Sequence, residues 1–310
     1  MTGSPLGPGP EFDRIRAISL ALGARAGGLG DDCAIIPDEG GTLVASIDSS
    51  VEGVHFRLDW ISLEGAGYRA AASALSDLAA AGARVVGLMC ALSAPRDATS
   101  EELASFMRGV AGALDATGGM VLGGDLTSGT HWSATITVFG RASRIVRRTG
   151  ATPGDGVWVT GRLGGARAAV HAWQSGRKPD TAARTAFARP TPRIAAGEWL
   201  AAQGATAMMD LSDGLAGDAG HLAAASGARI DIDLERIPVH PSVMDPDPEA
   251  FAAAGGEDFE LLLCLPAGFV GSSAAGVPLT RIGVVAAGQG VSFRRNGQAI
   301  DLPPGYNHFA

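Results

Sequence analysis

Carboxylate side chains recur beside glycine or serine at six places in the chain, each after an apolar run. The six segments are Gly30-Asp31-Asp32-Cys33, Ser46-Ile47-Asp48-Ser49, Leu75-Ser76-Asp77-Leu78, Gly123-Gly124-Asp125-Leu126, Asp210-Leu211-Ser212-Asp213-Gly214 and Gly255-Gly256-Glu257-Asp258. An apolar run that ends in a carboxylate is typical of a strand that brings an acid to one edge of a sheet. The pattern therefore predicts that these acids can converge on one site.

Clustered carboxylates repel one another unless cations lie between them, and oxygen ligands suit hard divalent ions, above all Mg²⁺. Magnesium bound by several carboxylates is typical of enzymes whose substrates carry phosphate. Taken singly, an aspartate beside glycine or serine is more often a turn former or a helix cap. The prediction of nucleotide-phosphate chemistry therefore rests on the whole set of acids and not on any one of them.

The overall composition is that of a globular protein of about two domains. The chain has 310 residues, 46% of them hydrophobic and 18% charged, with a net charge of −8. This balance argues against a nucleic-acid-binding surface, which requires a basic face. No apolar run reaches the roughly 18 residues that span a bilayer, and no signal peptide is visible at the start. We expect a cytoplasmic protein without nucleic-acid or membrane partners.

Lysine and cysteine usage excludes several other classes of site. The only lysine is Lys178, which lies in neither a P-loop nor a kinase strand motif, so the two commonest phosphoryl-transfer architectures are excluded. The cysteines Cys33, Cys90 and Cys264 are far apart and form no C-x-x-C pair. This spacing argues against a disulfide framework and against a structural zinc site.

Helical and strand patterns alternate irregularly along the chain. We expect strands at 42–48, 84–93, 132–141, 156–160, 205–210, 228–234, 258–265, 279–286 and 290–295, helices at 64–82, 100–117, 191–203 and 215–226, and a further helix after Gly165. A short apolar run at 119–125 ends at Asp125, and segments 167–190 and 235–256 stay unassigned. Without strict βαβ alternation, the pattern favours two α/β or α+β domains with mixed sheets.

The order of the motifs resembles that of the thiamine-monophosphate kinase family, within the wider superfamily of aminoimidazole-ribonucleotide synthetases. The resemblance runs from residue 11 to residue 310. It rests on the six segments above together with Asp48-Ser49-Ser50-Val51-Glu52-Gly53-Val54-His55-Phe56, Arg148-Thr149-Gly150-Ala151, Val159-Thr160-Gly161, Arg189-Pro190-Thr191-Pro192-Arg193 and Gly305-Tyr306-Asn307-His308-Phe309. Ser49-Ser50 departs from the threonine–leucine common in the family, and Ala74 stands where asparagine is frequent.

The resemblance implies ATP-dependent phosphorylation of thiamine monophosphate to thiamine diphosphate with several Mg²⁺ ions. It implies metal ligands at Asp32, Ser46, the Ile47 carbonyl, Asp48, Asp77, Asp125, Asp210 and Asp213. It further implies ATP contacts at Gly124, Asp125, Arg148 and Ser212, and contacts with thiamine phosphate at His55, Glu257 and Tyr306. The Gly/Pro-rich start predicts a disordered tail at 1–10, and the turn-rich stretch at 147–156 predicts a domain boundary. The expected domains are an ATP- and magnesium-binding, dimerising domain at 11–148 and a C-terminal α/β domain at 149–310. The resemblance implies a homodimer.

Elementary chemistry agrees with this expectation. A phosphate acceptor has its second pKa near about 6 and is largely ionised at neutral pH, so no catalytic base is expected. The difficulty is to bring two polyanions together, which metals and arginine can do. Without the family, His55, Glu257 and Tyr306 are interpreted equally well as structural residues. The turn Gly161-Arg162-Leu163-Gly164-Gly165 is either an ordinary loop or a phosphate contact at a helix start.

Two alternatives stay open at this point. One is another ATP-dependent enzyme of the same superfamily, such as a ring-closing synthetase of purine synthesis or a hydrogenase-maturation dehydratase. The chain ends in Tyr306-Asn307-His308-Phe309-Ala310, without the terminal cysteine of such dehydratases. The other is a non-catalytic sensor of nucleotide or thiamine phosphate, which has less need of several metal-binding acids.

Overall fold

The computed structural model describes residues 7, 13, 16, 31–38 and 41–302. The expected tail at 1–10, apart from residue 7, and the expected ligand Tyr306 lie outside these described residues. Among the residues that are described, no helix combines the length and the apolar character that a membrane crossing requires.

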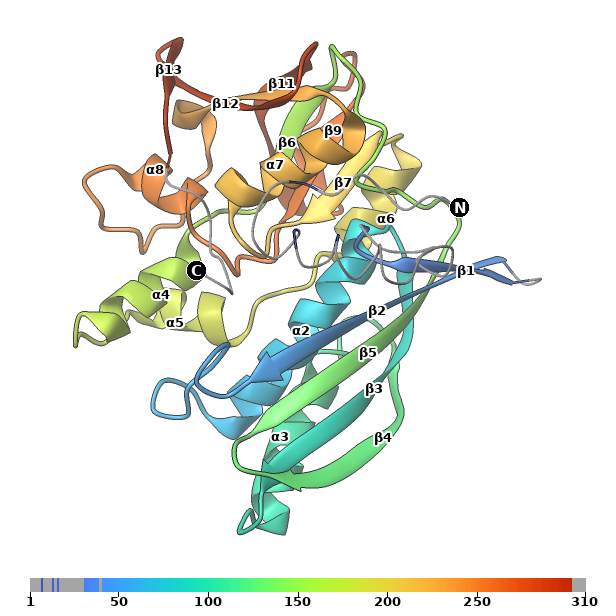
Figure 1. The fold of residues 1–310 in the computed structure, drawn as a ribbon, viewed down its shortest axis with the longest axis vertical. Coiled ribbons are helices and arrows are strands. Elements are labelled where there is room, and N and C mark those ends of the chain that lie inside the picture. The colour runs from blue at the N-terminus through green and yellow to red at the C-terminus, as the bar shows by residue number, and fades with distance from the viewer. Residues whose placement is uncertain (1–6, 8–12, 14–15, 17–30, 39–40, 303–310) are drawn as a thin grey trace.

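The first half of the chain builds a five-stranded sheet covered on one face by two helices (Figure 1). The strand order is β1-β2-β5-β3-β4, antiparallel except for the parallel pair of β3 and β4. The elements are β1 (Ala34–Asp38), β2 (Gly41–Val51), α2 (Leu63–Ala80), β3 (Arg84–Pro95), α3 (Ser100–Gly112), β4 (Met120–Gly129) and β5 (Ser133–Ala142). Side chains along β5 alternate between buried and half-buried, as expected for a sheet with one covered face.

The second half builds a larger mixed sheet, of which β6, β7 and β9 are buried throughout. Its strand order is β13-β12-β8-β11-β6-β9-β7, with β10 paired to β11. The elements are β6 (Gly156–Thr160), α4 (Gly165–Gln174), α5 (Thr181–Ala188), α6 (Ile194–Ala202), β7 (Ala207–Asp210), α7 (Leu215–Ser226), β8 (Arg229–Asp233), η2 (Leu234–Arg236), α8 (Pro248–Ala253), β9 (Leu261–Leu265), β10 (Ser273–Ala274), β11 (Val277–Ala286), β12 (Gly290–Arg295) and β13 (Gln298–Ile300).

Helix α2 lies between the two halves and packs against both. Its alanines are buried along nearly the whole helix, and small side chains allow neighbouring backbones to come close. A Cβ atom at Gly197 in α6 would lie 2.1 Å from the carbonyl oxygen of Ala79, so only glycine permits this approach. The same device joins α2 to α3, where a Cβ at Gly67 would lie 2.0 Å from the Phe106 oxygen. The position of α2 relative to β7 is fixed by these contacts.

The expected fold class, two α/β domains with mixed sheets, is confirmed. Helix α3 ends at Gly112 and not at 117, because the amides of Leu114 and Asp115 donate to carbonyls three residues earlier and not four. Strand β4 continues past Asp125 to Gly129, since its parallel pairing with β3 continues to Pro95. The unassigned segments 167–190 and 235–256 hold most of α4, then α5, and the short η2 and α8. The expected boundary at 148/149 falls in the connection between β5 and β6.

Candidate active site

Three carboxylates from distant parts of the sequence lie together where the two halves of the chain meet. Asp32 precedes β1, Asp77 lies near the end of α2, and Asp210 is the last residue of β7. One oxygen atom of each lies within 4.8 Å of those of the others. The Ser46 hydroxyl on β2 donates a 2.6 Å hydrogen bond to Asp77 Oδ2. Four residues expected to bind metal are thus neighbours, and we call Asp32, Asp77 and Asp210 the acid cluster.

Ionisation of Asp77 and Asp210 in the acid cluster is disfavoured. Burial, followed by the charge of Asp32, raises the pKa of Asp210 to about 8, although Arg148 opposes this shift. Burial and then the charges of Asp210, Asp32 and Asp48 raise the pKa of Asp77 well above its ordinary value. Carboxylates crowded in this way require more positive charge than a single arginine supplies. The oxygen-only donor set fits a hard divalent cation such as Mg²⁺.

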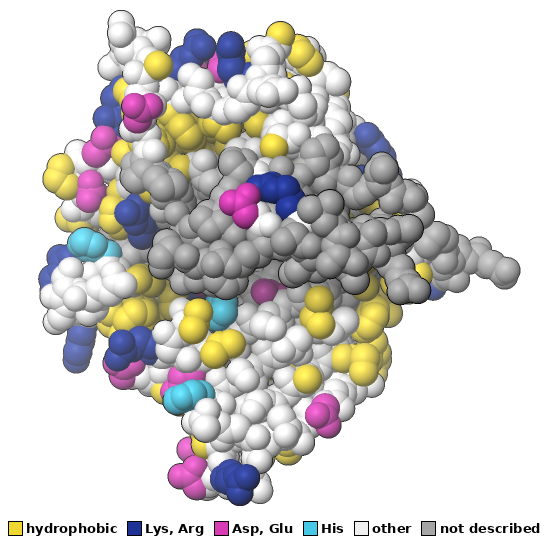
Figure 2. All heavy atoms as spheres, in the orientation of Figure 1, with side chains coloured by type: hydrophobic (Ala, Val, Ile, Leu, Met, Phe, Trp, Pro, Cys, Tyr) yellow, Lys and Arg dark blue, Asp and Glu magenta, His cyan; other side chains and the backbone are white. Residues whose placement is uncertain are grey.

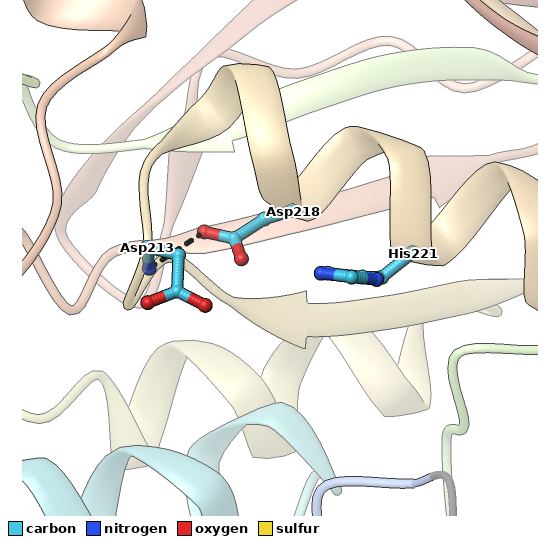
Figure 3. Close-up of side chains that lie close together, drawn as sticks. All are labelled: Asp213, Asp218 and His221. Atoms are coloured by element: carbon cyan, nitrogen blue, oxygen red, sulfur yellow. Dashed lines mark hydrogen bonds between the residues drawn. The ribbon is translucent and has the colours of Figure 1, made fainter. Parts of the chain in front are cut away.

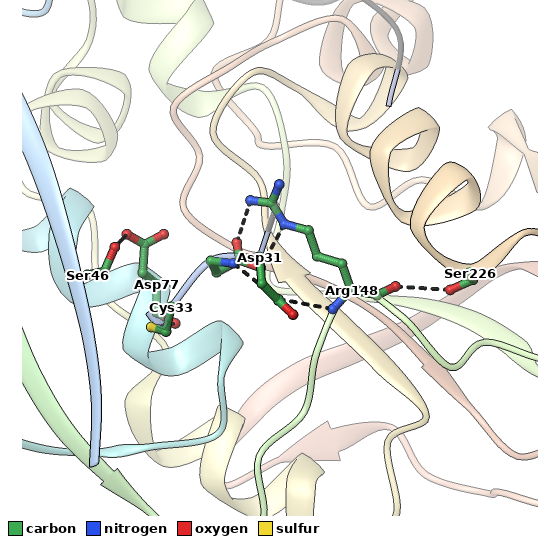
Figure 4. Close-up of polar contacts among 7 residues, drawn as sticks. Asp31, Cys33, Ser46, Asp77, Arg148 and Ser226 are labelled. Atoms are coloured by element: carbon green, nitrogen blue, oxygen red, sulfur yellow. Dashed lines mark hydrogen bonds and ion pairs between the residues drawn. The ribbon is translucent and has the colours of Figure 1, made fainter. Parts of the chain in front are cut away.

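Arg148 is the basic side chain nearest the cluster (Figure 4). Its Nε and Nη2 atoms donate to the two carboxylate oxygens of Asp32 at 2.8 Å each. The Arg148 amide donates to Asp31 Oδ1 at 3.3 Å, and its carbonyl accepts from Ser226 Oγ at 3.0 Å. Burial alone would lower the pKa of Arg148, but Asp32 and the other acids raise it above its ordinary value. Asp31, not among the expected ligands, thus holds the backbone of Arg148, while Asp32 holds its guanidinium.

Asp48 and Asp125 lie on opposite faces of the first sheet. Asp48 is in register with Ile136, Cys90 and Gly124 across four strands, and the buried Ile136 and Cys90 place this row on the helix-covered face. Asp125 is in the next row, with Ala91, Thr135 and Ser49, and is exposed. Strand β2, which holds Asp48, and strand β4, which holds Asp125, are three strand spacings apart, about 14 Å. Within one chain, Asp125 therefore cannot join Asp48 at a common ion.

The expectation that Asp48 and Asp125 end their strands is therefore wrong, while Asp77 lies in the helix expected at 64–82. Asp77 lies inside a helix, because its leucine and alanine neighbours repeat with helical spacing. Asp48 and Asp125 lie inside strands whose pairing continues beyond them. Asp210 does end its strand. The Ile47 side chain is 65% exposed on the open face of the sheet, and its expected ligand atom is the backbone carbonyl.

A second group of possible metal ligands surrounds Asp213 at the start of α7 (Figure 3). Single ligand atoms of Asp213, Asp218 and His221 all lie within 4.8 Å of one another. The carboxylate of Asp218 accepts from the amides of Asp213 at 3.2 Å and Gly214 at 3.0 Å. Asp218, not Asp213, therefore supplies the acceptor at this helix start. Burial and then Arg148 lower the pKa of His221 to about 4, which keeps its imidazole neutral.

The expected substrate residues His55 and Glu257 meet at one buried arginine, Arg69. The backbone carbonyl of His55 accepts from Arg69 Nε at 3.2 Å, and the carboxylate of Glu257 forms an ion pair with Arg69 Nη2. The Glu257 amide donates to the carbonyl of Ser212 at 2.7 Å, which links it to an expected ATP contact. His55 Nδ1 accepts from the Val51 amide at 3.1 Å, so a neutral imidazole carries its proton on Nε2.

The glycine-rich turn at 161–165 is not a phosphate contact. The amide of Gly164 donates to Asp258 Oδ2 at 2.8 Å, so a carboxylate from the same chain already occupies the start of α4. Gly161 lies against Glu260, because a Cβ there would come within 1.9 Å of its carboxylate. Glu260 in turn accepts from Thr160 at 2.6 Å and from Arg193 Nε at 2.7 Å. The interpretation as a structural loop is the correct one.

Sequence reasoning missed Asp31, Asp218, His221 and Arg69. Asp31 is visible in the sequence as the first acid of a pair. Asp218 and His221 are three residues apart and thus share one face of an expected helix, so their spacing after Asp213 was a usable signal. Arg69 gave no signal, because nothing in an alanine-rich helix distinguishes a buried arginine from an exposed one.

Comparisons with known proteins identify the family. Residues 30–142 match the N-terminal domain, and residues 152–296 the C-terminal domain, of AIR synthase related proteins. The thiamine-monophosphate kinase of Salmonella typhimurium is 36% identical, over 96% of this chain and 96% of its own length. A structure described as AaThiL complexed with AMPPCP and TMP is 31% identical, with a TM-score of 0.87 over 96% of this chain and 97% of that chain.

A more distant structure shares the fold alone. The hydrogenase maturation protein HypE in complex with ATP is 18% identical, with a TM-score of 0.72 over 86% of this chain and 87% of that one. The identity of 36% along almost the entire length of the Salmonella enzyme distinguishes the two branches. By its length, its motifs and its fold, the chain belongs to the thiamine-monophosphate kinase family.

Proposed function

We propose that this protein transfers the γ-phosphoryl group of ATP to thiamine monophosphate, giving thiamine diphosphate. The observation that carries the proposal is the acid cluster with Arg148, where carboxylates outnumber basic side chains among the described residues. A polyphosphate with its divalent cations balances such a site. Membership of the kinase family and the relative described with AMPPCP and TMP support both substrates.

The proposed chemistry uses no catalytic base. The acceptor phosphate is largely ionised at neutral pH, so its oxygen needs orientation and not deprotonation. Asp32, Ser46, Asp48, Asp77 and Asp210 would hold Mg²⁺, which when bound neutralises phosphate charge during transfer. Arg148 could then pair with the carboxylate of Asp32 or with a phosphate group, because its planar guanidinium suits both. Asp213, with Asp218 and His221 beside it, would hold a further ion.

The acceptor would bind at His55 and Glu257. A proton on His55 Nε2 suits a phosphate oxygen, and the carboxylate of Glu257 suits the cationic ring of thiamine. Tyr306, outside the described residues, stays a prediction for this site. Gly124 and Ser212 stay predictions for ATP, and the cytoplasmic location stays a prediction as well.

The test is formation of thiamine diphosphate from ATP and thiamine monophosphate, with Mg²⁺ or with EDTA. We expect Mg²⁺-dependent product from the wild type and from Asp97→Asn, an exposed aspartate used as the matched control. Asp77→Asn should lose most of the activity. A wild type that binds or hydrolyses ATP but makes no thiamine diphosphate would refute the substrate assignment.

We also propose that the protein is a homodimer formed through the open face of the first sheet. Exposed apolar side chains gather on its strands, and Figure 2 shows hydrophobic side chains on the side of this sheet that faces the viewer. They are Ile36, Ile47, Val86, Met89, Met120 and Leu122. Large exposed apolar patches mark protein interfaces. Asp125 points to the same face, so it could reach a metal site only in a second copy.

Analytical ultracentrifugation tests this assembly. We expect a dimer for the wild type and a monomer for Met89→Asp, because a charge placed in an apolar interface is left without a partner. Val270→Asp, at a residue that is 93% exposed in the other half of the chain, is the control and should stay dimeric. A wild type that sediments as a monomer at micromolar concentration would contradict the proposal.

A further inference from the structure

Arg69 lies inside the protein and contacts both residues that we propose for acceptor binding. It is in the second turn of α2 and is 2% exposed. Its guanidinium donates to the carbonyl oxygens of His55 at 3.2 Å and Phe187 at 2.7 Å, and it forms an ion pair with Glu257. One side chain thus joins the turn after β2, the end of α5 and the loop before β9.

Two aromatic rings hold the guanidinium in this position. The central carbon of the Arg69 guanidinium lies 4.0 Å from the ring centroid of Phe187 and 5.9 Å from that of Phe259. Cation–π attraction adds to the hydrogen bonds, and the rings exclude water from the ion pair. Because the guanidinium is planar and its donors point in fixed directions, its three partners keep a fixed spacing.

The loop that carries Glu257 needs such support. Glu257 has φ 67° and Phe259 has φ 50°, in the left-handed region that few residues other than glycine adopt. Such conformations persist where surrounding contacts hold them, and they are common at ligand sites. The amides of both residues donate to carbonyls of the 211–212 segment, at 2.7 and 2.9 Å. These bonds fix the backbone of the loop, and Arg69 fixes the side chain of Glu257.

We propose that Arg69 is a positioning residue that sets the distance between His55 and Glu257 and thereby the affinity for the acceptor. His55 belongs to the first half of the chain, Glu257 to the second, and α2 lies between them. The Glu257 side chain is 33% exposed, so part of the carboxylate is accessible while Arg69 holds it. This inference rests on the function proposed above and deepens it. Among the described residues, no hydrogen bond or ion pair joins Arg69 to Arg148 or to the acid cluster, so the affinity for ATP should change little when Arg69 is replaced.

The experiment compares Arg69→Met and Arg69→Lys with the matched control Arg189→Met. Arg189 also joins α5 to α2, with Glu64 at 3.4 Å and the Tyr68 ring at 4.7 Å, but its side chain is 50% exposed. KM for thiamine monophosphate and KM for ATP are measured separately. Amide hydrogen exchange is followed in peptides that cover residues 52–56 and 255–260.

We expect Arg69→Met to raise KM for thiamine monophosphate by about 10- to 100-fold, since small misplacement of binding groups has effects of this size, and to change KM for ATP by less than about twofold. Both peptides should exchange faster. Arg69→Lys should be intermediate, because lysine keeps the charge opposite Glu257 but lacks the fork of donors. Arg189→Met should match the wild type in every measurement.

Other outcomes separate this inference from the proposed function. Equal increases in both KM values, or unchanged exchange in both peptides of a folded variant, would overturn the positioning role. If Arg69→Met does not fold, Arg69→Lys decides the question by the same two criteria. If the wild type makes no thiamine diphosphate while exchange still increases in the variant, the proposed function fails and the structural role of Arg69 stands.

Discussion

The acid cluster and the Arg69 region are both buried meeting points of the two halves, but their charge balance differs. In the acid cluster, Asp32, Asp77 and Asp210 share one nearby guanidinium, that of Arg148, and the pKa of Asp210 is raised to about 8. In the Arg69 region one arginine faces one carboxylate, with aromatic rings around the pair. Unbalanced carboxylates indicate a place for cations, whereas a balanced pair holds its two side chains in fixed positions. The difference predicts opposite responses to neutralisation of an acid.

The largest effect is expected for Asp77→Asn. Loss of a ligand that holds transition-state charge should lower kcat by on the order of 10²- to 10³-fold. In EDTA at pH 8, however, the variant should unfold at a higher temperature than the wild type, because a carboxylate with a raised pKa is disfavoured there in its ionised form. Activity assays and thermal unfolding in EDTA measure the two effects. A lower unfolding temperature for the variant than for the wild type in EDTA would show that nearby positive charge already balances the carboxylates of the acid cluster.

Glu257→Gln should have the opposite effect on stability. It leaves the guanidinium of Arg69 buried without a counter-charge, and removal of one partner of a buried pair is destabilising. Since Glu257 is 33% exposed, water offsets part of the loss, and we expect about 1–3 kcal/mol. Chemical denaturation in EDTA gives the free energy of unfolding. The double variant Arg69→Met/Glu257→Gln should be less destabilised than the sum of the two single variants.

Asp258→Asn tests whether the backbone amides of residues 164–166 can stabilise a buried carboxylate as a cation would. Burial raises the pKa of Asp258 to about 8, although the amides of residues 164–166 counter the shift. Because this folded-state pKa exceeds the ordinary value of 3.8, Asp258 favours the folded state at low pH and loses that contribution as the pH rises toward 8. In Asp258→Asn the free energy of unfolding should therefore fall less steeply as the pH rises, by at most about 1.4 kcal/mol per pH unit.

The smallest effect is expected for Arg189→Met. Its ion pair with Glu64 is exposed on both sides, and such pairs contribute less than about 0.5 kcal/mol in many cases. The denaturation midpoint should match that of the wild type, and added salt should not separate the two. A clear loss of stability would mean that an arginine between α2 and α5 matters without being buried, which would weaken the distinction drawn for Arg69.

The sequence predicted the chemistry of the cluster better than its geometry. The resemblance to the family implied Asp32, Ser46, Asp77 and Asp210 as neighbouring ligands, and these residues do lie together. Strand ends were the wrong explanation for Asp48 and Asp125, because the strands that hold them continue to Val51 and Gly129. The opposite faces of Asp48 and Asp125 follow from register, which is set by pairing with β5 and β3. Arg69 is distinguished only by its burial, which the sequence pattern does not reveal.

The close approach of α6 and α2 at Gly197 has a consequence for the size of ion that the acid cluster would accept. Asp77 lies two residues before the Ala79 carbonyl that Gly197 touches, and α6 leads directly into the strand that ends in Asp210. Magnesium requires ligands at about 2.0–2.1 Å, whereas calcium accepts about 2.3–2.6 Å. A methyl group at position 197 would push α6 away from α2 and separate the carboxylates of Asp77 and Asp210. Glycine at position 197 thus favours a short distance between the carboxylates of Asp77 and Asp210, which suits the smaller ion.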